Sequence, residues 1–332
     1  MNNTQIILKS RPKGMVTLEN FEVRTGEAPT PGEGQLLVKN LFLSVDPYMR
    51  GRMNAARTYA ANFEVGEVVP GRTVGRVIAS RNPGFAEGDT VLTGLGWENY
   101  SLSAGRGLRR LPDDAEHLSA YLGVLGMPGF TGYYGLLEIG RPRPGETVYV
   151  SGAAGAVGSV VGQVAKLAGC RVVGSAGSDE KVAHLLELGF DGAFNYRDAG
   201  SLREAVRSAC PDGIDIYFDN VGGETLEAAL ATMNTYGRIV ACGAISRYND
   251  AGLRPGPNNM FLVIARRLKI QGFIVSDHEA HRSAFEADMT RWLAEGKVRY
   301  RETVTEGVEN APKAFLQLFT GNKIGKQLVR VG

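Results

Sequence analysis

The hydrophobic positions of this 332-residue chain follow one pattern in its first part and another beyond it. Up to about residue 125 the apolar stretches are short and β-prone, as over residues 36–45, 73–79 and 90–92, and prolines and glycines separate them. Short alternating stretches predict strands, and frequent turn residues between them are typical of a compact barrel-like domain. We therefore expect a β-rich first domain.

After about Leu118, strand-like and helix-like stretches alternate regularly. The predicted strands are residues 147–151, 171–175, 193–196, 214–218, 238–242 and 269–275, and the predicted helices are one ending at Leu167 and those over 179–188, 201–209, 224–233, 258–268 and 278–295. Ser178 is expected to cap the second of these helices and Gly189 to close it. Such alternation predicts a parallel sheet with helices on both faces. The tail, residues 298–332, returns to a β-type pattern and is expected to rejoin the first domain.

The strand predicted at 147–151 leads directly into glycines at positions 152, 155 and 158. Glycine lets the backbone turn sharply and approach a pyrophosphate, whose charge interacts with the N–H groups that begin the next helix. The spacing Gly-x-x-Gly-x-x-Gly is not the commoner Gly-x-Gly-x-x-Gly, and such a turn alone also occurs as simple packing. Its position at the first crossover of a doubly wound sheet favours a dinucleotide site.

The end of the second predicted strand bears on which dinucleotide is bound. NAD-selective sites carry an acidic residue there for the ribose 2′-hydroxyl. Residues 174–177 contain no carboxylate, and Lys181 and Arg197 lie close by in the sequence, which favours the 2′-phosphate of NADP(H). The alternative is that Asp179 binds the ribose, although it also suits the first turn of a helix. Lys181 is equally compatible with an ordinary surface lysine.

The composition argues against several other classes of protein. A hydrophobic content of 43% and a charged content of 22% are ordinary for a globular protein, and a net charge of +2 with scattered cations does not suggest nucleic-acid binding. The N-terminal residues are polar, so neither a signal peptide nor a membrane span is expected. The three cysteines are odd in number and far apart, which argues against disulfides and predicts a cytoplasmic protein.

Ligands for a catalytic zinc ion are missing where they would be needed. A zinc alcohol dehydrogenase of this two-domain type requires a cysteine and a histidine in its first domain, and residues 1–116 contain neither. His278 and His281 are spaced i, i+3 without an evident third ligand, and we expect them to be solvated. No metal is predicted, so polarising a carbonyl group would require hydrogen-bond donors of the protein or of the cofactor.

Six motifs together resemble a known family over essentially the whole chain. They are SVDPYMR at 44–50, MPGFTGYYG at 127–135, AAGAVG at 153–158, GSDEK at 177–181, FDNVGG at 218–223 and GAISRYN at 243–249. The chain resembles the zinc-independent medium-chain dehydrogenases/reductases, and among them the NADPH-dependent enone and alkenal double-bond reductases. The resemblance implies a GroES-like domain of residues 1–125 and 299–332, a Rossmann NADP-binding domain of residues 126–298, and a homodimer.

The resemblance also implies roles for individual residues. NADPH would be bound by Gly155, Ala156, Val157 and Gly158 at the pyrophosphate, Lys181 and Tyr196 at the 2′-phosphate, Asn220, Cys242 and Ser246 along the sheet edge, and Phe273, Ile274, Val275, Met127 and Thr131 around the nicotinamide. Tyr48 and Tyr248 would face the substrate. The tail departs from the family's Gly-x-Asn-x-Gly-Lys, because Lys323 takes the Asn position and Asn322 lies one residue before it. Which of these two contacts the cofactor stays open.

The expected reaction is reduction of the C=C bond of an α,β-unsaturated ketone or aldehyde, with hydride passing from NADPH to the β-carbon. The enolate oxygen then needs a donor and the α-carbon a proton. Tyr248, with a phenol pKa near 10, is the expected donor, and the nicotinamide ribose hydroxyl and water are alternatives. Tyr48 is either a second substrate residue or a filler between domains. Two other functions remain open: an NADPH quinone reductase, and a non-catalytic NADPH-binding relative.

Overall fold

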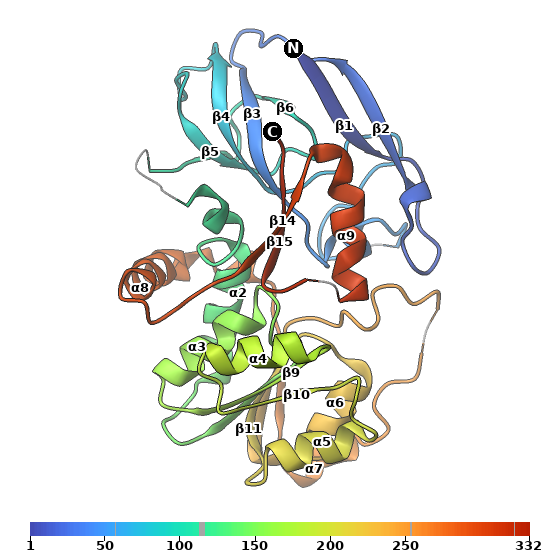
Figure 1. The fold of residues 1–332 in the computed structure, drawn as a ribbon, viewed down its shortest axis with the longest axis vertical. Coiled ribbons are helices and arrows are strands. Elements are labelled where there is room, and N and C mark those ends of the chain that lie inside the picture. Colours follow the sequence, from blue (N-terminus) through green and yellow to red (C-terminus); the bar gives the residue numbers. More distant parts are fainter. Residues whose placement is uncertain (57, 113–116, 253, 322) are drawn as a thin grey trace. The chain divides into compact units, whose positions relative to one another are not determined.

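The computed structural model describes residues 1–332 apart from 57, 113–116, 253 and 322, and it divides into two compact units (Figure 1). Unit 1 comprises Met1–Leu122, Glu302–Lys323 and Gln327–Gly332, and unit 2 comprises Gly123–Arg301 and Ile324–Lys326. Unit 1 is β-rich and unit 2 is built on a parallel sheet, so the predicted α/β fold class is confirmed.

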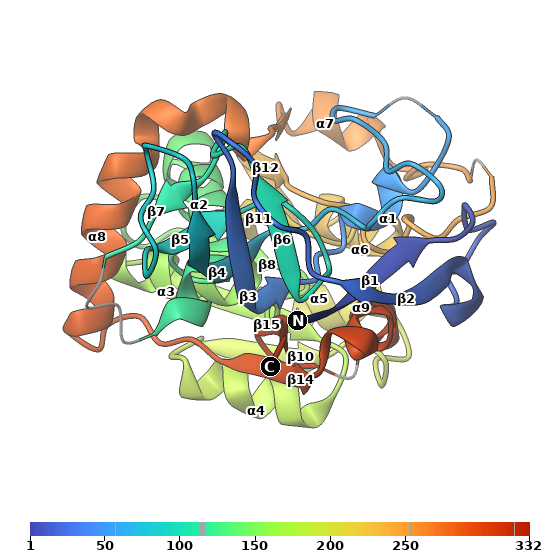
Figure 2. The same cartoon turned by 90° about the horizontal axis from the view of Figure 1, so that it is seen from above.

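Unit 1 is built mainly from antiparallel strands. They are β1 (Asn2–Leu8), β2 (Phe21–Glu27), β3 (Leu36–Ser44), β4 (Thr73–Ser80), β5 (Thr90–Thr93), β6 (Tyr100–Ser103), β7 (Arg109–Arg110), β14 (Glu302–Glu306) and β15 (Lys326–Arg330). The larger sheet has the order β14-β15-β3-β4-β5-β7 with β6 beside β3, and β1 pairs with β2 (Figure 2). The three strands predicted for this part of the chain are β3, β4 and β5.

Short helices and one longer helix complete unit 1. They are η1 (Leu18–Asn20), α1 (Met49–Arg52), η2 (Leu118–Leu122), η5 (Val308–Asn310) and α9 (Ala311–Thr320). The prediction of a wholly β-type tail was therefore wrong for α9. Its buried residues Ala311, Phe315 and Leu318 repeat at i, i+4 and i+7, which is a helical period, and Phe315 packs edge-on against Trp97.

Unit 2 contains a six-stranded parallel sheet in the order β10-β9-β8-β11-β12-β13. The strands are β8 (Thr147–Val150), β9 (Arg171–Ala176), β10 (Gly192–Asn195), β11 (Ile214–Asp219), β12 (Met233–Ala241) and β13 (Lys269–Gly272). The chain passes from β8 outward to β10 and then returns to β11 on the other side of β8. This is the strand order of a doubly wound dinucleotide-binding sheet, with its switch point between β8 and β11.

Helices cover both faces of this sheet. They are α2 (Met127–Tyr134), η3 (Gly135–Gly140), α3 (Gly158–Leu167), α4 (Asp179–Glu187), α5 (Leu202–Ala209), α6 (Gly223–Leu230), α7 (Phe261–Ala265), η4 (Val275–His281) and α8 (Arg282–Ala294). Tyr149 and Tyr217 stack on the face covered by α5 and α6, with ring centroids 5.1 Å apart, while α3 and α4 lie against the other face. Ser178 caps α4 as predicted. Helix α7 is shorter than the predicted 258–268, and the helix predicted over 278–295 is divided between η4 and α8.

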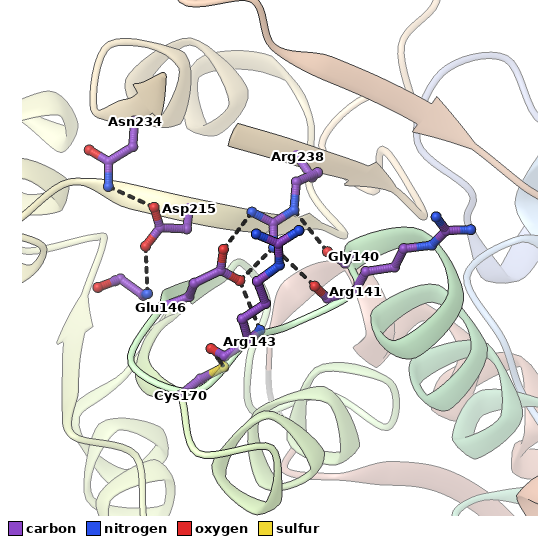
Figure 3. Close-up of polar contacts among 9 residues, drawn as sticks. Gly140, Arg141, Arg143, Glu146, Cys170, Asp215, Asn234 and Arg238 are labelled. Carbon is purple, nitrogen blue, oxygen red and sulfur yellow. Dashed lines mark hydrogen bonds and ion pairs between the residues drawn. The ribbon is translucent and has the colours of Figure 1, made fainter. Parts of the chain in front are cut away.

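A cluster of polar groups joins β8, β12 and the segment after η3 in unit 2 (Figure 3). The Arg238 guanidinium donates to both carboxylate oxygens of Glu146, at 2.9 and 2.5 Å, and to the carbonyl oxygens of Gly140 and Arg141, at 2.9 and 3.2 Å. The Arg143 N–H donates to the same carboxylate at 2.9 Å. Burial raises the pKa of Glu146, but these hydrogen bonds and charges outweigh it, so the pKa lies below its ordinary value.

The Glu146–Arg238 pair is therefore expected to stabilise unit 2 in a pH-dependent way. Glu146→Gln leaves a partly buried guanidinium without its carboxylate, which costs roughly 2 kcal/mol, or about 4–8 °C in the midpoint of thermal unfolding at pH 7. The pKa of Glu146 is lower in the folded protein than in the unfolded chain. The pair therefore stabilises the fold at a pH above the pKa of the unfolded chain, and this stabilisation is lost as the pH falls through the pKa of the folded protein. The difference between the two proteins should shrink as the pH is lowered below the ordinary pKa of a glutamate, which is about 4.3. Glu295→Gln, at an exposed pair with Lys297, is the control. An equal difference at every pH would contradict this account.

Candidate functional site

The predicted cofactor residues of unit 2 converge on one edge of its sheet. Except for Met127 and Thr131 on α2, each follows the carboxyl end of a parallel strand: Gly155–Gly158 after β8, Lys181 after β9, Tyr196 after β10, Asn220 after β11, Cys242 and Ser246 after β12, and Phe273–Val275 after β13. Tyr248 also follows β12. Ligands of doubly wound sheets bind at this edge, close to the switch point.

The glycine turn after β8 brings the backbone close to the start of α3. A methyl group at Gly158 would lie 2.7 Å from both the Ala153 Cα and the Gly152 carbonyl oxygen, so only glycine fits there without displacing the turn. Gly152 has a φ of +59°, a conformation that favours glycine. In the described part of the chain, no protein acceptor pairs with the N–H groups of Ala156, Val157 and Gly158. These donors suit a phosphate group.

A segment from the end of the chain borders this turn within unit 2. The Gly325 N–H donates to the Ala154 carbonyl oxygen at 2.8 Å, and Gly325 and Gly155 form an isolated parallel bridge. A Cβ atom at Gly325, whose φ is +69°, would collide with the Arg301 carbonyl oxygen. Of the two tail residues left open by the sequence, Asn322 lies outside the described residues. A contact of Lys323 with the cofactor stays a prediction.

Two cations, Lys181 and Arg197, lie near each other after the ends of β9 and β10. Burial lowers the pKa of Lys181, and the nearby Arg197 guanidinium lowers it further, while Glu180 opposes this. The Tyr196 ring lies against Gly177, where an added methyl group would come within 2.9 Å of the Tyr196 hydroxyl. Two neighbouring cations and a phenol hydroxyl fit a phosphate dianion.

Asp179, the alternative ribose ligand, is already engaged in a local contact. Its carboxylate accepts a hydrogen bond from the Asn195 side chain at 3.1 Å, and it lies in the first turn of α4, where a negative charge is favourable. This arrangement supports the interpretation of Asp179 as a helix-terminus residue and leaves Lys181 and Arg197 as the charged groups suited to a 2′-phosphate.

A buried carboxylate that the sequence analysis did not single out organises the switch point. Asp219, at the end of β11, accepts hydrogen bonds from the Tyr217 hydroxyl at 2.7 Å and from the N–H groups of Val221 and Gly222 at 3.0 and 2.8 Å. Burial raises its pKa, and these bonds oppose the rise. The signal in the sequence was an acid between an apolar strand and a glycine pair, which is the pattern of a turn that needs an internal acceptor.

Hydrogen bonds connect this turn, through Asn220, to the end of β8, and they also connect it to the loop after β12. The Asn220 side-chain amide donates to the Ser151 carbonyl oxygen at 2.8 Å, which joins the ends of β8 and β11. The Cys242 N–H donates to the Asp219 carbonyl oxygen at 2.9 Å. Desolvation, with the Asp219 carboxylate, raises the pKa of the Cys242 thiol to about 12, so it is present as an uncharged thiol. The Ser246 hydroxyl donates to the Val221 carbonyl oxygen at 2.6 Å.

Tyr248 is folded back over the carboxyl end of β12. Its hydroxyl accepts a hydrogen bond from the Ala244 N–H at 3.3 Å and would lie 3.1 Å from a methyl group at Gly243. The phenol oxygen is therefore placed at the sheet edge by its own loop.

The residues predicted around the nicotinamide lie beside α2. The Phe273 ring packs against Tyr134 with centroids 5.7 Å apart, and a methyl group at Gly135 would come within 2.7 Å of Phe273. At the other end of α2, the Thr131 hydroxyl donates to the Met127 carbonyl oxygen at 2.8 Å. A methyl group at Gly132 would lie 3.1 Å from the Val157 carbonyl oxygen, which places this helix against the glycine turn.

His278 and His281 are both partly exposed, as expected, but both also contact an aromatic ring. The His278 ring stacks on Tyr134 with centroids 4.1 Å apart, and the His281 ring meets the same tyrosine edge-on at 5.1 Å. The reason is that η4 follows the Phe273 segment directly and packs on α2. Both histidines are thus part of an aromatic cluster.

Tyr48 belongs to unit 1, where it precedes α1. Burial raises the pKa of its hydroxyl above the ordinary value, and the Asp46 carboxylate adds to this rise, while Arg72 and Arg52 oppose it. The phenol therefore keeps its proton at neutral pH and is able to donate a hydrogen bond.

Comparison with known proteins identifies the family of this chain. A family model described as the N-terminal domain of oxidoreductase matches residues 4–111, and one described as zinc-binding dehydrogenase matches residues 156–295. NADPH-dependent curcumin reductase of Escherichia coli (strain K12) is 46% identical over 99% of this chain and 97% of that protein. Prostaglandin reductase 1 of Rattus norvegicus is 49% identical over 97% of each. The chain belongs to the medium-chain dehydrogenase/reductase superfamily.

Within that superfamily, the chain belongs with the NADPH-dependent enone and alkenal reductases, as its motifs indicated. The crystal structure of CurA in complex with NADPH from Vibrio vulnificus superposes with a TM-score of 0.95 at 45% identity, covering 99% of both chains. One matching family model is described as zinc-binding, yet no three His, Cys, Asp or Glu residues are grouped to hold a metal ion in the described part of this reductase. Among the same residues, no helix is long and apolar enough to cross a membrane.

Proposed function

We propose that this reductase uses NADPH to reduce the C=C bond of α,β-unsaturated ketones and aldehydes, without a metal ion. The proposal depends most on one observation. Along a single sheet edge lie two neighbouring cations, Lys181 and Arg197, then the backbone N–H groups of residues 156–158, and then the phenol of Tyr248. The identity of 46% to a curcumin reductase and 49% to a prostaglandin reductase supports it.

The residues present fit NADPH. Gly155–Gly158 would hold the pyrophosphate through backbone N–H groups, and Lys181 and Tyr196, with Arg197, the 2′-phosphate. Asn220, Cys242 and Ser246 would follow the cofactor along the edge. Phe273–Val275 on one side, with Met127 and Thr131 on the other, would hold the nicotinamide. When bound, NADPH supplies the hydride that the substrate's β-carbon receives.

Tyr248 and Tyr48 would then stabilise the negative charge that develops on the substrate by donating hydrogen bonds. As electron density moves to the carbonyl oxygen, a positioned phenol stabilises the developing enolate by hydrogen bonding. Tyr248 is the proposed donor, because its own loop holds the hydroxyl at the sheet edge. Tyr48, kept protonated by burial and by Asp46, is proposed to face the substrate as well. Orientation of the acceptor carbon would supply most of the rate, so loss of one phenol should reduce activity rather than abolish it.

Assembly and location complete the proposal. Strand β13 ends the parallel sheet of unit 2, and Ile270 on it is 39% exposed, which supports the proposed homodimer through this edge. A cytoplasmic location and the domain boundaries at 125/126 and 298/299 are proposed from the sequence.

A side-by-side activity assay tests the function. NADPH oxidation is followed at 340 nm with a small enone, a 2-alkenal and a quinone, at matched concentrations. We expect turnover of the enone and the alkenal, with kcat/KM at least about tenfold higher than for the quinone. Turnover of the quinone alone would identify a quinone reductase. NADPH binding without turnover of any of the three would identify a non-catalytic relative.

A further inference from the structure

The loop that carries Tyr248 is held in two different ways along its length. Its first half is fastened by backbone hydrogen bonds to the turn after β11. These bonds run from Gly243 N–H to Asp219 O at 2.9 Å, from Ile245 N–H to Asn220 O at 3.2 Å, and from Ser246 N–H to Val221 O at 3.2 Å. This half therefore belongs to the rigid sheet edge.

The first half of the loop ends at Arg247, and the second half, which begins after Tyr248, is more exposed. The described contacts between the two halves converge on Arg247. The Arg247 guanidinium forms an ion pair with the Asp250 carboxylate at 3.4 Å and donates to the Pro255 carbonyl oxygen at 3.2 Å. The Asp250 N–H donates to the Arg247 carbonyl oxygen at 3.0 Å. Asp250 also pairs with Arg254 at 3.2 Å. One side chain thus links three points of the loop.

The Arg247 side chain lies beside the start of α6. A methyl group at Gly223, the first residue of α6, would lie only 3.4 Å from its Nε atom. The side chains of Arg247 and Asp250 are 32% and 15% exposed, so the pair is partly shielded from water and from salt. A fully exposed ion pair contributes little to stability, so a partly shielded pair orders a loop more effectively.

Tyr248 lies between the two residues of this ion pair in the sequence. We propose that Arg247 is a positioning residue of the reductase, which restricts the Tyr248 phenol by tying the chain after Tyr248, at Asp250 and Pro255, to the residue before it. The Ala244 N–H holds the hydroxyl through its hydrogen bond of 3.3 Å. This inference rests on the proposed function, because it assigns Arg247 a role only through Tyr248.

A double-mutant cycle separates positioning from a merely structural role. The proteins are the wild type, Arg247→Met, Tyr248→Phe and the double variant, assayed with one enone and NADPH. Methionine keeps the apolar stem of the arginine and removes its charge. We expect each single variant to lose about tenfold in kcat/KM and the double variant to lose no more than about twofold beyond either, because both changes remove the same contribution. The Kd of NADPH and the midpoint of thermal unfolding should stay unchanged in Arg247→Met.

Two further variants sharpen the result. Arg247→Lys keeps the charge but not the fork that reaches two acceptors, so it should recover only part of the loss. Arg203→Met, at an exposed position on α5, is the matched control and should behave like the wild type.

The outcomes are distinct. Losses that multiply to about a hundredfold in the double variant would overturn the inference, as would wild-type activity of Arg247→Met or of Tyr248→Phe. A weaker Kd for NADPH in Arg247→Met would show that the arginine acts on the cofactor site instead. If the wild type does not reduce the enone, the proposed function fails and the inference fails with it. If the wild type is active and the losses multiply, only the inference fails.

Discussion

Gly158→Ala is expected to weaken NADPH binding by about a hundredfold or more. The added methyl group would lie 2.7 Å from the Ala153 Cα and from the Gly152 carbonyl oxygen, both backbone atoms that no side-chain rotation can move away. The glycine turn and the start of α3 would have to separate, which displaces the N–H groups of residues 156–158 from the phosphate they are proposed to bind. Overpacking of this kind also costs about 1–3 kcal/mol of stability.

The measurement is the Kd of NADPH, from the fluorescence of the bound nicotinamide or from calorimetry. Circular dichroism and the unfolding midpoint show whether the variant remains folded. Gly200→Ala is the matched control, because an alanine Cβ there meets no atom within 4 Å and the position precedes α5 in the same unit. A folded Gly158→Ala protein with wild-type affinity for NADPH would contradict the proposed pyrophosphate site.

Lys181→Met is expected to change the choice of cofactor. NADPH and NADH differ only in the 2′-phosphate, so losing a cation that contacts this group should raise the Kd of NADPH by about 10–100-fold, or about 1.4–2.7 kcal/mol. The Kd of NADH should change by less than about twofold. Arg197 lies near Lys181 and would retain part of the attraction, so Lys181→Met/Arg197→Met should lose more than either single variant.

Lys269→Met is the control for the removal of a positive charge. Lys269 is exposed and is the first residue of β13. It therefore lies at the amino ends of the parallel strands, whereas the site lies at their carboxyl ends. Lys269→Met should leave both Kd values unchanged. Equal weakening of NADPH and NADH binding by Lys181→Met would mean that the lysine does not recognise the 2′-phosphate and contributes only general attraction.

The regular part of the fold could be predicted because its sequence pattern has one interpretation. Strands such as β8 and β11 are buried, and turn residues and amphipathic helices follow them, so the parallel sheet and its carboxyl edge could be derived from the sequence. The order of the strands then brought Lys181, Tyr196 and Asn220 to one edge. Distance along the chain does not matter there, because all parallel strands end at the same side of the sheet.

Other features depend on tertiary contacts that a local pattern does not contain. Helix α9 is a different case, because Ala311, Phe315 and Leu318 do carry a helical period, which was overlooked when the whole tail was interpreted as β-type. The stacking of His278 on Tyr134 was not expected, because it results from the return of η4 to α2. Asp219 was overlooked because its role lies in accepting internal hydrogen bonds, and neither its partners nor its burial is visible in one sequence.

The same limit applies to the chemistry. The glycine turn predicts a phosphate site, but the geometry of the Tyr248 loop emerged only with the Ala244 contact and the Arg247–Asp250 pair. Charge alone would have placed Arg247 and Arg254 among the scattered surface cations. Their ion pairs with Asp250 are visible only in the structure.

The central claim is that hydride passes from NADPH to the β-carbon of an enone. The most direct test uses NADPH deuterated at the nicotinamide C4, on each face in turn, with a small α,β-unsaturated ketone, and locates the label by NMR and mass spectrometry. The account predicts a saturated ketone with one deuterium at the β-carbon from one of the two cofactors, and a solvent-derived proton at the α-carbon. Deuterium at the carbonyl carbon, with an allylic alcohol as the product, would contradict it.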